Sequence, residues 1–285
     1  MLKRFAPAKV NLALHVTGRR ADGYHLLDSI VVFPAIGDTL TLHDREDGQG
    51  LIAITGPYAH RLSAEGDNLI ARAAYLLSDA VDRPLDDLAF TLDKQLPVEA
   101  GIGGGSADAA AALHLLNDHW GQPLDVDALA ALGLTLGADV PVCLAGQSAR
   151  MSGIGEIVTV LPTPPQGALV LVNPGVAVPT GPVFRGLDGV FGKGFGDLPA
   201  LIDADWLADQ RNDLERPAIN VAPVIASALT ALGATDGCQV ARMSGSGATL
   251  FGLYPDQASA DQAAAALRVA YPDWWIKSAG LLDAV

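Results

Sequence analysis

The chain has 285 residues, of which half are hydrophobic and 18% are charged, as in a soluble globular protein of one or two domains. Its net charge of −14 argues against a nucleic-acid partner, and its two cysteines, which lack ligand-like spacing, argue against a disulfide framework or a zinc site. No signal-peptide-like segment and no apolar run of membrane-spanning length occur, so we expect a cytoplasmic protein without a membrane partner, whose oligomeric state stays unknown.

Apolar and polar residues alternate with a period of two over residues 9–16, which predicts the first strand. Lys9 and Asn11 would project from the same face of this strand, about 7 Å apart. Solvent could simply cover that face, as on an edge strand. The chain has only five lysines against thirteen arginines, however, which makes a lysine in this strand worth attention.

A polar turn follows the first strand. Its Asp22-Gly23 pair is a turn signal and places Tyr24 and His25 just beyond a loop tip. On composition alone, such a pair more often packs against neighbours than recognises a ligand.

Short strands and one helix are predicted next. The strands are expected over residues 30–33, 39–42, 51–54 and 88–92, with residues 44–50 as a hairpin connection. Helical periodicity covers residues 68–78, and Asp67 is the expected N-cap.

A glycine-rich loop opens onto a helix in the stretch from Pro97 to Asn117. Four glycines stand in five positions, and the alanine- and leucine-rich segment behind them favours a helix with Ser106 as N-cap. Such a loop exposes unpaired N–H groups and the positive end of a helix dipole, which suits a phosphate. A plain surface loop is the alternative. A Walker loop is excluded because no lysine follows these glycines. A dinucleotide fingerprint is excluded because Ser106 stands where that motif has a third glycine or an alanine.

Two signals beyond this helix concern the site and the domain division. Asp139, followed by Pro141, has the pattern of an N-cap with proline in the first helical turn. Capping alone explains Asp139, although a carboxylate at a helix start can also belong to a site. The proline-rich segment over 161–167 is the clearest linker signal, so we predict domains over residues 1–160 and 161–285.

The remaining elements alternate without regular βαβ spacing. Strands are predicted over 168–172, 238–243 and 274–278, and helices over 125–132, 221–232 and 256–270. A second glycine turn, from Ser244 to Gly247, leads into a strand. This order predicts an α+β protein of two domains.

Three segments, in this order, resemble the three motifs of the GHMP small-molecule kinases. They are the strand carrying Lys9 and Asn11, the stretch from Pro97 to Ala107, and the turn over 244–247. The resemblance spans nearly the whole chain. It implies the two-domain GHMP kinase fold, with an N-terminal ATP-binding α/β domain, a C-terminal ferredoxin-like domain and the active site in the cleft between them. ATP and Mg²⁺ are the implied cofactors.

Further segments are similar to the branch of this superfamily that acts on a cytidine diphosphate-linked polyol. They are residues 8–12, 22–25, 137–141, 179–180 with Phe184, and 212–215. A sibling kinase for a sugar, homoserine or mevalonate is the nearer alternative, and a nucleotide-binding regulator without catalysis is the more distant one.

Carried over by position, the resemblance implies a role for individual residues. Asp139 would act as base or positioner and Lys9 as charge stabiliser, roles that suit phosphoryl transfer to an alcohol. The implied substrate-binding residues are Asn11, Tyr24, His25, Thr180 and Phe184. The implied ATP-binding residues are Asn68, Lys94, Pro97, Gly101, Gly103, Gly104, Gly105, Ser106, Ala107 and Gly245. Many relatives have a second serine where this chain has Ala107, so the metal ligands stay unknown.

Overall fold

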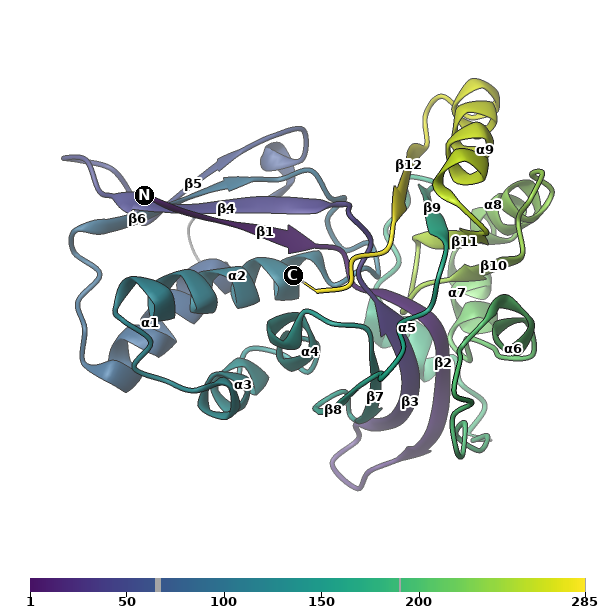
Figure 1. The fold of residues 1–285 in the computed structure, drawn as a ribbon, viewed down its shortest axis with the longest axis horizontal. Helices are drawn as coiled ribbons and strands as arrows, with labels where there is room; N and C mark the ends of the chain where they lie inside the picture. Colours follow the sequence, from purple (N-terminus) through teal and green to yellow (C-terminus); the bar gives the residue numbers. More distant parts are fainter. Residues whose placement is uncertain (65–67, 190, 285) are drawn as a thin grey trace.

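The computed structural model describes residues 1–64, 68–189 and 191–284 and contains three four-stranded β-sheets with helices packed around them (Figure 1). Two sheets use strands that end by residue 160, and the third uses strands that begin at residue 168. The expected α+β class is therefore confirmed. Among the described residues, no helix has the length and apolar character needed to cross a membrane.

The first sheet supports the glycine-rich loop. It has the order β1 (Leu2–Pro7), β4 (Gly37–Asp44), β6 (Leu88–Asp93) and β5 (Ile52–Thr55). β5 pairs with β6 in parallel and does not pair with β4, so the expected hairpin connection over 44–50 is wrong. Local sequence around 44–50 carries no signal for this pairing, because β6 lies more than 30 residues further along the chain. A short 3₁₀ helix (Ala59–Arg61) follows β5. α2 (Gly104–His119) packs on the sheet through buried alanines, and α1 (Leu69–Val81) packs against α2.

The second sheet carries the first predicted strand. Its order is β2 (Val10–Arg19), β3 (His25–Val32), β7 (Ala149–Gly153) and β8 (Ile157–Val160). β2 confirms the strand that the alternating pattern predicted, and both of its faces are buried over residues 10–16. The helix α4 (Val140–Ala145) lies between α2 and this sheet, and α3 (Val126–Leu134) packs against α4 (Figure 1).

The third sheet is antiparallel throughout, with the order β10 (Val240–Met243), β11 (Leu250–Tyr254), β9 (Ala168–Asn173) and β12 (Trp275–Gly280). α8 (Val224–Gly233) and α9 (Gln257–Ala270) pack on it. This βαββαβ arrangement confirms the ferredoxin-like domain. Three short helices precede α8, namely α5 (Thr180–Arg185), α6 (Ala204–Ala208) and α7 (Glu215–Val221).

The two halves of the chain share one hydrophobic cluster. It joins Val10 and Leu12 of β2 to Leu169 of β9 and Phe251 of β11. The segment after β12 also returns to the first half of the chain (Figure 1). There the Leu282 N–H donates to the carbonyl of Phe33, the residue after β3, at 2.8 Å. The domain boundary at residue 160 stays a prediction. In the part of the chain that the structure describes, no sheet contains strands from both sides of this residue, but one hydrophobic cluster does contain residues from both sides.

The N-cap of α2 differs from the expected one. α2 has Gly103 as its N-cap, with φ 64°, so the expected cap Ser106 is wrong and lies inside the first turn. The left-handed backbone at the N-cap favours glycine, so the helix begins after Gly103 and not after Ser106. Asp67 lies outside the described residues. The N-cap of α1 is Asn68, whose Oδ1 accepts the Ile70 N–H at 2.9 Å.

A buried ion triad joins the first sheet to the beginning of α2. Lys94, 2% exposed, donates from Nζ to Asp38 Oδ2 at 2.6 Å and to Asp108 Oδ2 at 2.7 Å. Asp38 Oδ1 also accepts the N–H groups of Gln95 and Leu96. Burial works to lower the pKa of Lys94, but the two carboxylates outweigh it and raise that pKa. Lys94 is therefore an internal counter-ion that ties β4, β6 and α2 together.

We expect Lys94→Met to lower the free energy of unfolding by about 3–5 kcal/mol, because it leaves two buried carboxylates without a partner. Urea denaturation measures the change, and Lys277→Met, at an exposed lysine of β12, is the matched control that should leave stability nearly unaltered. Near-native stability of the Lys94 variant together with weakened ATP binding would contradict the structural role and favour a direct nucleotide contact.

Candidate active site

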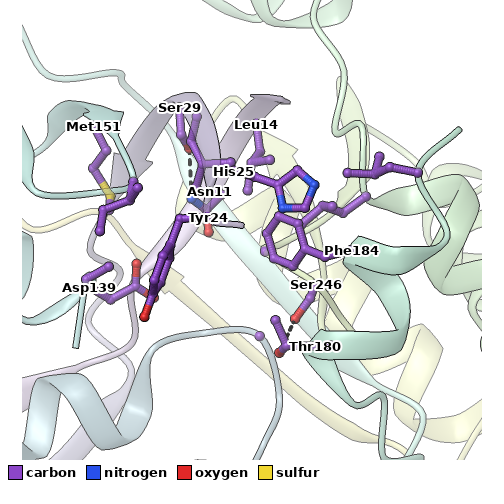
Figure 2. A pocket seen from close by; sticks show the side chains of 18 of the residues that line it. Asn11, Leu14, Tyr24, His25, Ser29, Asp139, Met151, Thr180, Phe184 and Ser246 are labelled. Atoms are coloured by element: carbon purple, nitrogen blue, oxygen red, sulfur yellow. Dashed lines mark hydrogen bonds between the residues drawn. The ribbon is translucent and has the colours of Figure 1, made fainter. Parts of the chain in front are cut away.

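A cleft of about 1210 Å³ lies where β2, β3, the glycine-rich loop, α4 and α5 meet. Its walls include the catalytic candidates Lys9 and Asp139, and the substrate-binding candidates that the sequence predicted. Figure 2 shows the labelled ones among them, such as Asn11, Asp139 and Phe184, around one space although they come from elements far apart in the sequence. The cleft also receives the turn over 244–247 from the C-terminal half, so both halves contribute to it.

Lys9 and Asp139 form the charged centre of the cleft. Lys9 lies between β1 and β2, is 4% exposed, and places Nζ 3.0 Å from Asp139 Oδ2 and 3.0 Å from Asn11 Oδ1. A solvated strand face is thereby excluded. Asp139 occupies the N-cap position of α4, yet its side chain makes no capping hydrogen bond and is 38% exposed. The expected capping by this carboxylate is therefore wrong, and its second oxygen stays available to a ligand.

The glycine-rich loop and the turn over 244–247 touch backbone to backbone. Gly101 has φ 73°, and a Cβ there would lie 2.6 Å from the Gly247 carbonyl oxygen. Gly245 has φ 54°, and a Cβ there would lie 2.7 Å from the Gly101 carbonyl oxygen. Ser244 Oγ bridges the two segments, since it donates to Gly101 O at 3.1 Å and accepts the Asn11 N–H at 3.0 Å. Glycine is required at both turns by this close approach.

Backbone N–H groups without an intrahelical partner stand at the start of α2, next to Gly103 and Ser106 of the cleft lining. The first helical bond runs from the Ala107 N–H to the Gly103 carbonyl, so the N–H groups of Gly104, Gly105 and Ser106 precede the helical ladder. With the dipole of a sixteen-residue helix behind them, these donors suit an anion. The fold thus contains the predicted glycine-rich loop that opens onto a long helix, and phosphate binding there stays a prediction.

The residues over 212–215 brace the second glycine turn. Asn212 Nδ2 donates to the carbonyls of Met243 and Gly245, both at 2.8 Å. Asp213 Oδ2 accepts the Val16 N–H at 2.7 Å, and Glu215 Oε2 accepts the Met243 N–H at 2.9 Å. These side chains therefore fix β2 and the turn relative to each other.

Aromatic side chains also line the cleft, and we call them the aromatic wall. The His25 and Phe184 rings are stacked with centroids 4.9 Å apart, and Tyr24 is 60% exposed (Figure 2). Phe191 meets His25 edge-on at 6.0 Å. Burial, with a contribution from the nearby Arg19 charge, lowers the pKa of His25, so its ring is neutral near pH 7. Flat aromatic faces next to a neutral imidazole suit a heterocyclic base.

Comparisons with known proteins agree with this geometry. The GHMP kinase N-terminal domain model matches residues 68–147, and the C-terminal model matches residues 196–273. The 4-diphosphocytidyl-2-C-methyl-D-erythritol kinase of Cereibacter sphaeroides is 51% identical over 98% of this chain and 99% of its own. That of Paramagnetospirillum magneticum is 50% identical, with 98% of each chain covered.

The chain belongs to the GHMP kinase family.

Solved structures support the same fold. A crystal structure of 4-(cytidine 5'-diphospho)-2C-methyl-D-erythritol kinase, 35% identical, superposes with a TM-score of 0.78 over 98% of this chain and 99% of that one. Homoserine kinase from Cytophaga hutchinsonii, 19% identical, has a TM-score of 0.74 over 99% and 95% and shares the fold. This GHMP kinase is accordingly a phosphotransferase that uses ATP.

The predicted site residues fall into two groups in this GHMP kinase. Those that line the cleft are Lys9, Asn11, Tyr24, His25, Gly101, Gly103, Ser106, Asp139, Thr180, Phe184 and Gly245. Those outside its lining are Asn68, Lys94, Pro97, Gly104, Gly105 and Ala107. The side chains of Asn68 and Lys94 are already engaged, in a helix cap and in the buried triad, and Ala107 is buried. Nucleotide contacts by this second group stay predictions.

Several cleft residues were missed by the sequence analysis. Arg19 precedes the Asp-Gly turn, and Arg185 and Phe191 lie in or beside a glycine-rich loop without periodicity. Ser29 is part of a buried strand, and Ser246 donates or accepts a 2.9 Å hydrogen bond with Thr180 Oγ1. Only Ser246 stood within a motif that the sequence made visible.

We expect Gly103→Ala to weaken ATP binding by roughly tenfold or more, because a Cβ at this left-handed position would lie 3.2 Å from Lys9 Cε and would crowd the phosphate-binding loop. Gly121→Ala is the matched control: its φ is 83° and no atom lies within 4 Å of the added Cβ. Both variants should lose about 1–2 kcal/mol of stability through the left-handed backbone. Calorimetric titration with ATP would contradict the assignment if both variants bind like the wild type.

Proposed function

We propose that this GHMP kinase transfers the γ-phosphoryl group of ATP to the 2-hydroxyl of 4-diphosphocytidyl-2-C-methyl-D-erythritol, in the non-mevalonate route to isoprenoids. The observation that carries the proposal is that a glycine-rich loop before a long helix, a Lys9–Asp139 pair and several aromatic side chains line one cleft. Relatives about 50% identical over nearly the full chain bear the name of this kinase.

ATP would bind with its phosphates at the loop. The free N–H groups before Ala107 and the dipole of α2 would hold the phosphate oxygens, and Ser106 would offer a hydroxyl beside them. Among the described residues, no group of three His, Cys, Asp or Glu side chains could hold a metal. Mg²⁺ would therefore be held mainly by the ATP phosphates and by water. When bound, Mg²⁺ would neutralise charge on the phosphate oxygens.

Lys9 and Asp139 would act on the acceptor. The open oxygen of Asp139 would accept a hydrogen bond from the substrate hydroxyl and take its proton as the phosphoryl group arrives. Lys9 Nζ would stabilise charge on the attacking oxygen and on the transferred group. Two of its three protons face Asn11 and Asp139, which leaves one for the reacting atoms.

The aromatic end of the cleft would hold the cytidine. A base entering between Tyr24 and Phe184 would stack on the His25 ring or displace it from its place against Phe184. Arg19 and Arg185 line the same region and have no ion pair in the part of the chain that the structure describes. In a chain of net charge −14, these guanidinium groups are suited to the diphosphate between base and polyol.

The test is phosphate transfer from ATP to the cytidylated polyol and to methylerythritol phosphate without cytidine. We expect turnover only of the first substrate. Tyr24→Ala should lower kcat/KM for it by about tenfold or more and leave ATP affinity unchanged, because one stacking face is lost. Tyr75→Ala, at a similarly exposed tyrosine outside the cleft lining, is the control. Equal turnover of the uncytidylated alcohol would move the assignment to a sibling kinase.

A further inference from the structure

Ser29 is a buried residue of the cleft lining that is hydrogen-bonded to Asn11, the neighbour of Lys9. It is on β3, is 1% exposed, and lies opposite Leu14 of β2. The pairing of β2 with β3 shifts register between Asn11 and Ala13. Ser29 Oγ is 2.8 Å from Asn11 Nδ2 and 2.7 Å from the Ala13 carbonyl oxygen, so one hydroxyl contacts both sides of this irregularity (Figure 2).

The chemistry of these groups fixes the direction of each hydrogen bond. A carbonyl oxygen only accepts, so the single Ser29 hydroxyl proton goes to Ala13 O. Ser29 Oγ can then only accept from Asn11, which turns the amide NH₂ of Asn11 toward Ser29 and its Oδ1 toward Lys9. The reverse amide orientation would set NH₂ against the Lys9 ammonium and two acceptor oxygens against each other.

The orientation of Asn11 in turn directs the Lys9 ammonium. Nζ donates one proton to Asn11 Oδ1 at 3.0 Å and a second to Asp139 Oδ2 at 3.0 Å. With these two directions fixed, the tetrahedral geometry of the ammonium also fixes its third N–H. A chain of four polar groups thus runs from the Ala13 carbonyl through Ser29 and Asn11 to the reacting end of Lys9.

We propose that Ser29 is a positioning residue for phosphoryl transfer, which acts by holding the Asn11 amide in the orientation that aims the third N–H of Lys9 at the reacting atoms. The proposal rests on the proposed roles of Lys9 and Asn11. It concerns a residue that contacts neither the nucleotide loop nor the aromatic wall in the described contacts.

The test compares Ser29→Ala, Ser29→Cys and Ser29→Thr on whichever alcohol the wild type phosphorylates. We expect kcat to fall about 10- to 100-fold in the Ala and Cys variants, because the buried Asn11 amide loses its acceptor and can turn. KM for ATP and for the alcohol should change less than about threefold. The Thr variant keeps the hydroxyl and should recover most of kcat. If the Ala variant fails to fold, the near-isosteric Cys variant carries the same comparison.

A double-mutant cycle separates positioning from general structural damage. In an Asn11→Ala background, Ser29→Ala should cost little further activity, since the group that it orients is absent. Ser148→Ala, at a buried serine with no partner for its hydroxyl among the described residues, is the control and should match the wild type. Additive losses in the cycle, or a Thr variant as slow as the Ala variant, would overturn the proposal. Failure on the cytidylated polyol alone would count against the proposed substrate instead.

Discussion

The backbone contact between two glycine turns is the constraint on which the cleft depends. Gly101 and Gly245 approach so closely that a Cβ on either would lie within 2.8 Å of the other segment's backbone. This contact brings the C-terminal half against the glycine-rich loop. Ser244 then bonds both Gly101 and the backbone of Asn11, which sets the strand beside Lys9 relative to the loop. Segments separated by more than a hundred residues are thereby held together around the cleft.

Charge is distributed sparingly in this acidic GHMP kinase. Two of its five lysines are buried near the loop, and each is bonded to carboxylate. Lys94 is ion-paired with the buried Asp38 and Asp108, so its charge is neutralised inside the fold. Lys9 is instead paired with Asp139, whose side chain is partly exposed in the cleft. The phosphates would therefore meet one lysine, backbone N–H groups and a helix dipole. Such an arrangement stabilises a transferring phosphoryl group through prearranged dipoles rather than through many mobile cations.

Local patterns in the sequence were sufficient for the strand β2, the glycine-rich loop and the position of Asp139 at a helix start, because period and turn chemistry are local properties. They could not show that Gly103 caps α2, since that depends on a left-handed φ, or that Lys94 is enclosed, since its partner Asp38 is 56 residues away. The hydrogen bond from Asn11 to Ser29 likewise depends on how two strands pair and shift. The sequence was thus informative about motifs and uninformative about what lies behind them.

The central claim is that the Asp139 carboxylate serves the reaction and not the fold, and Asp139→Asn tests it most directly. Because this side chain caps no helix, the variant should keep its stability and its ATP affinity. Its turnover number, measured at saturating substrates, should fall by on the order of 10²–10⁴. A variant that folds, binds ATP and turns over within about threefold of the wild type would contradict the account.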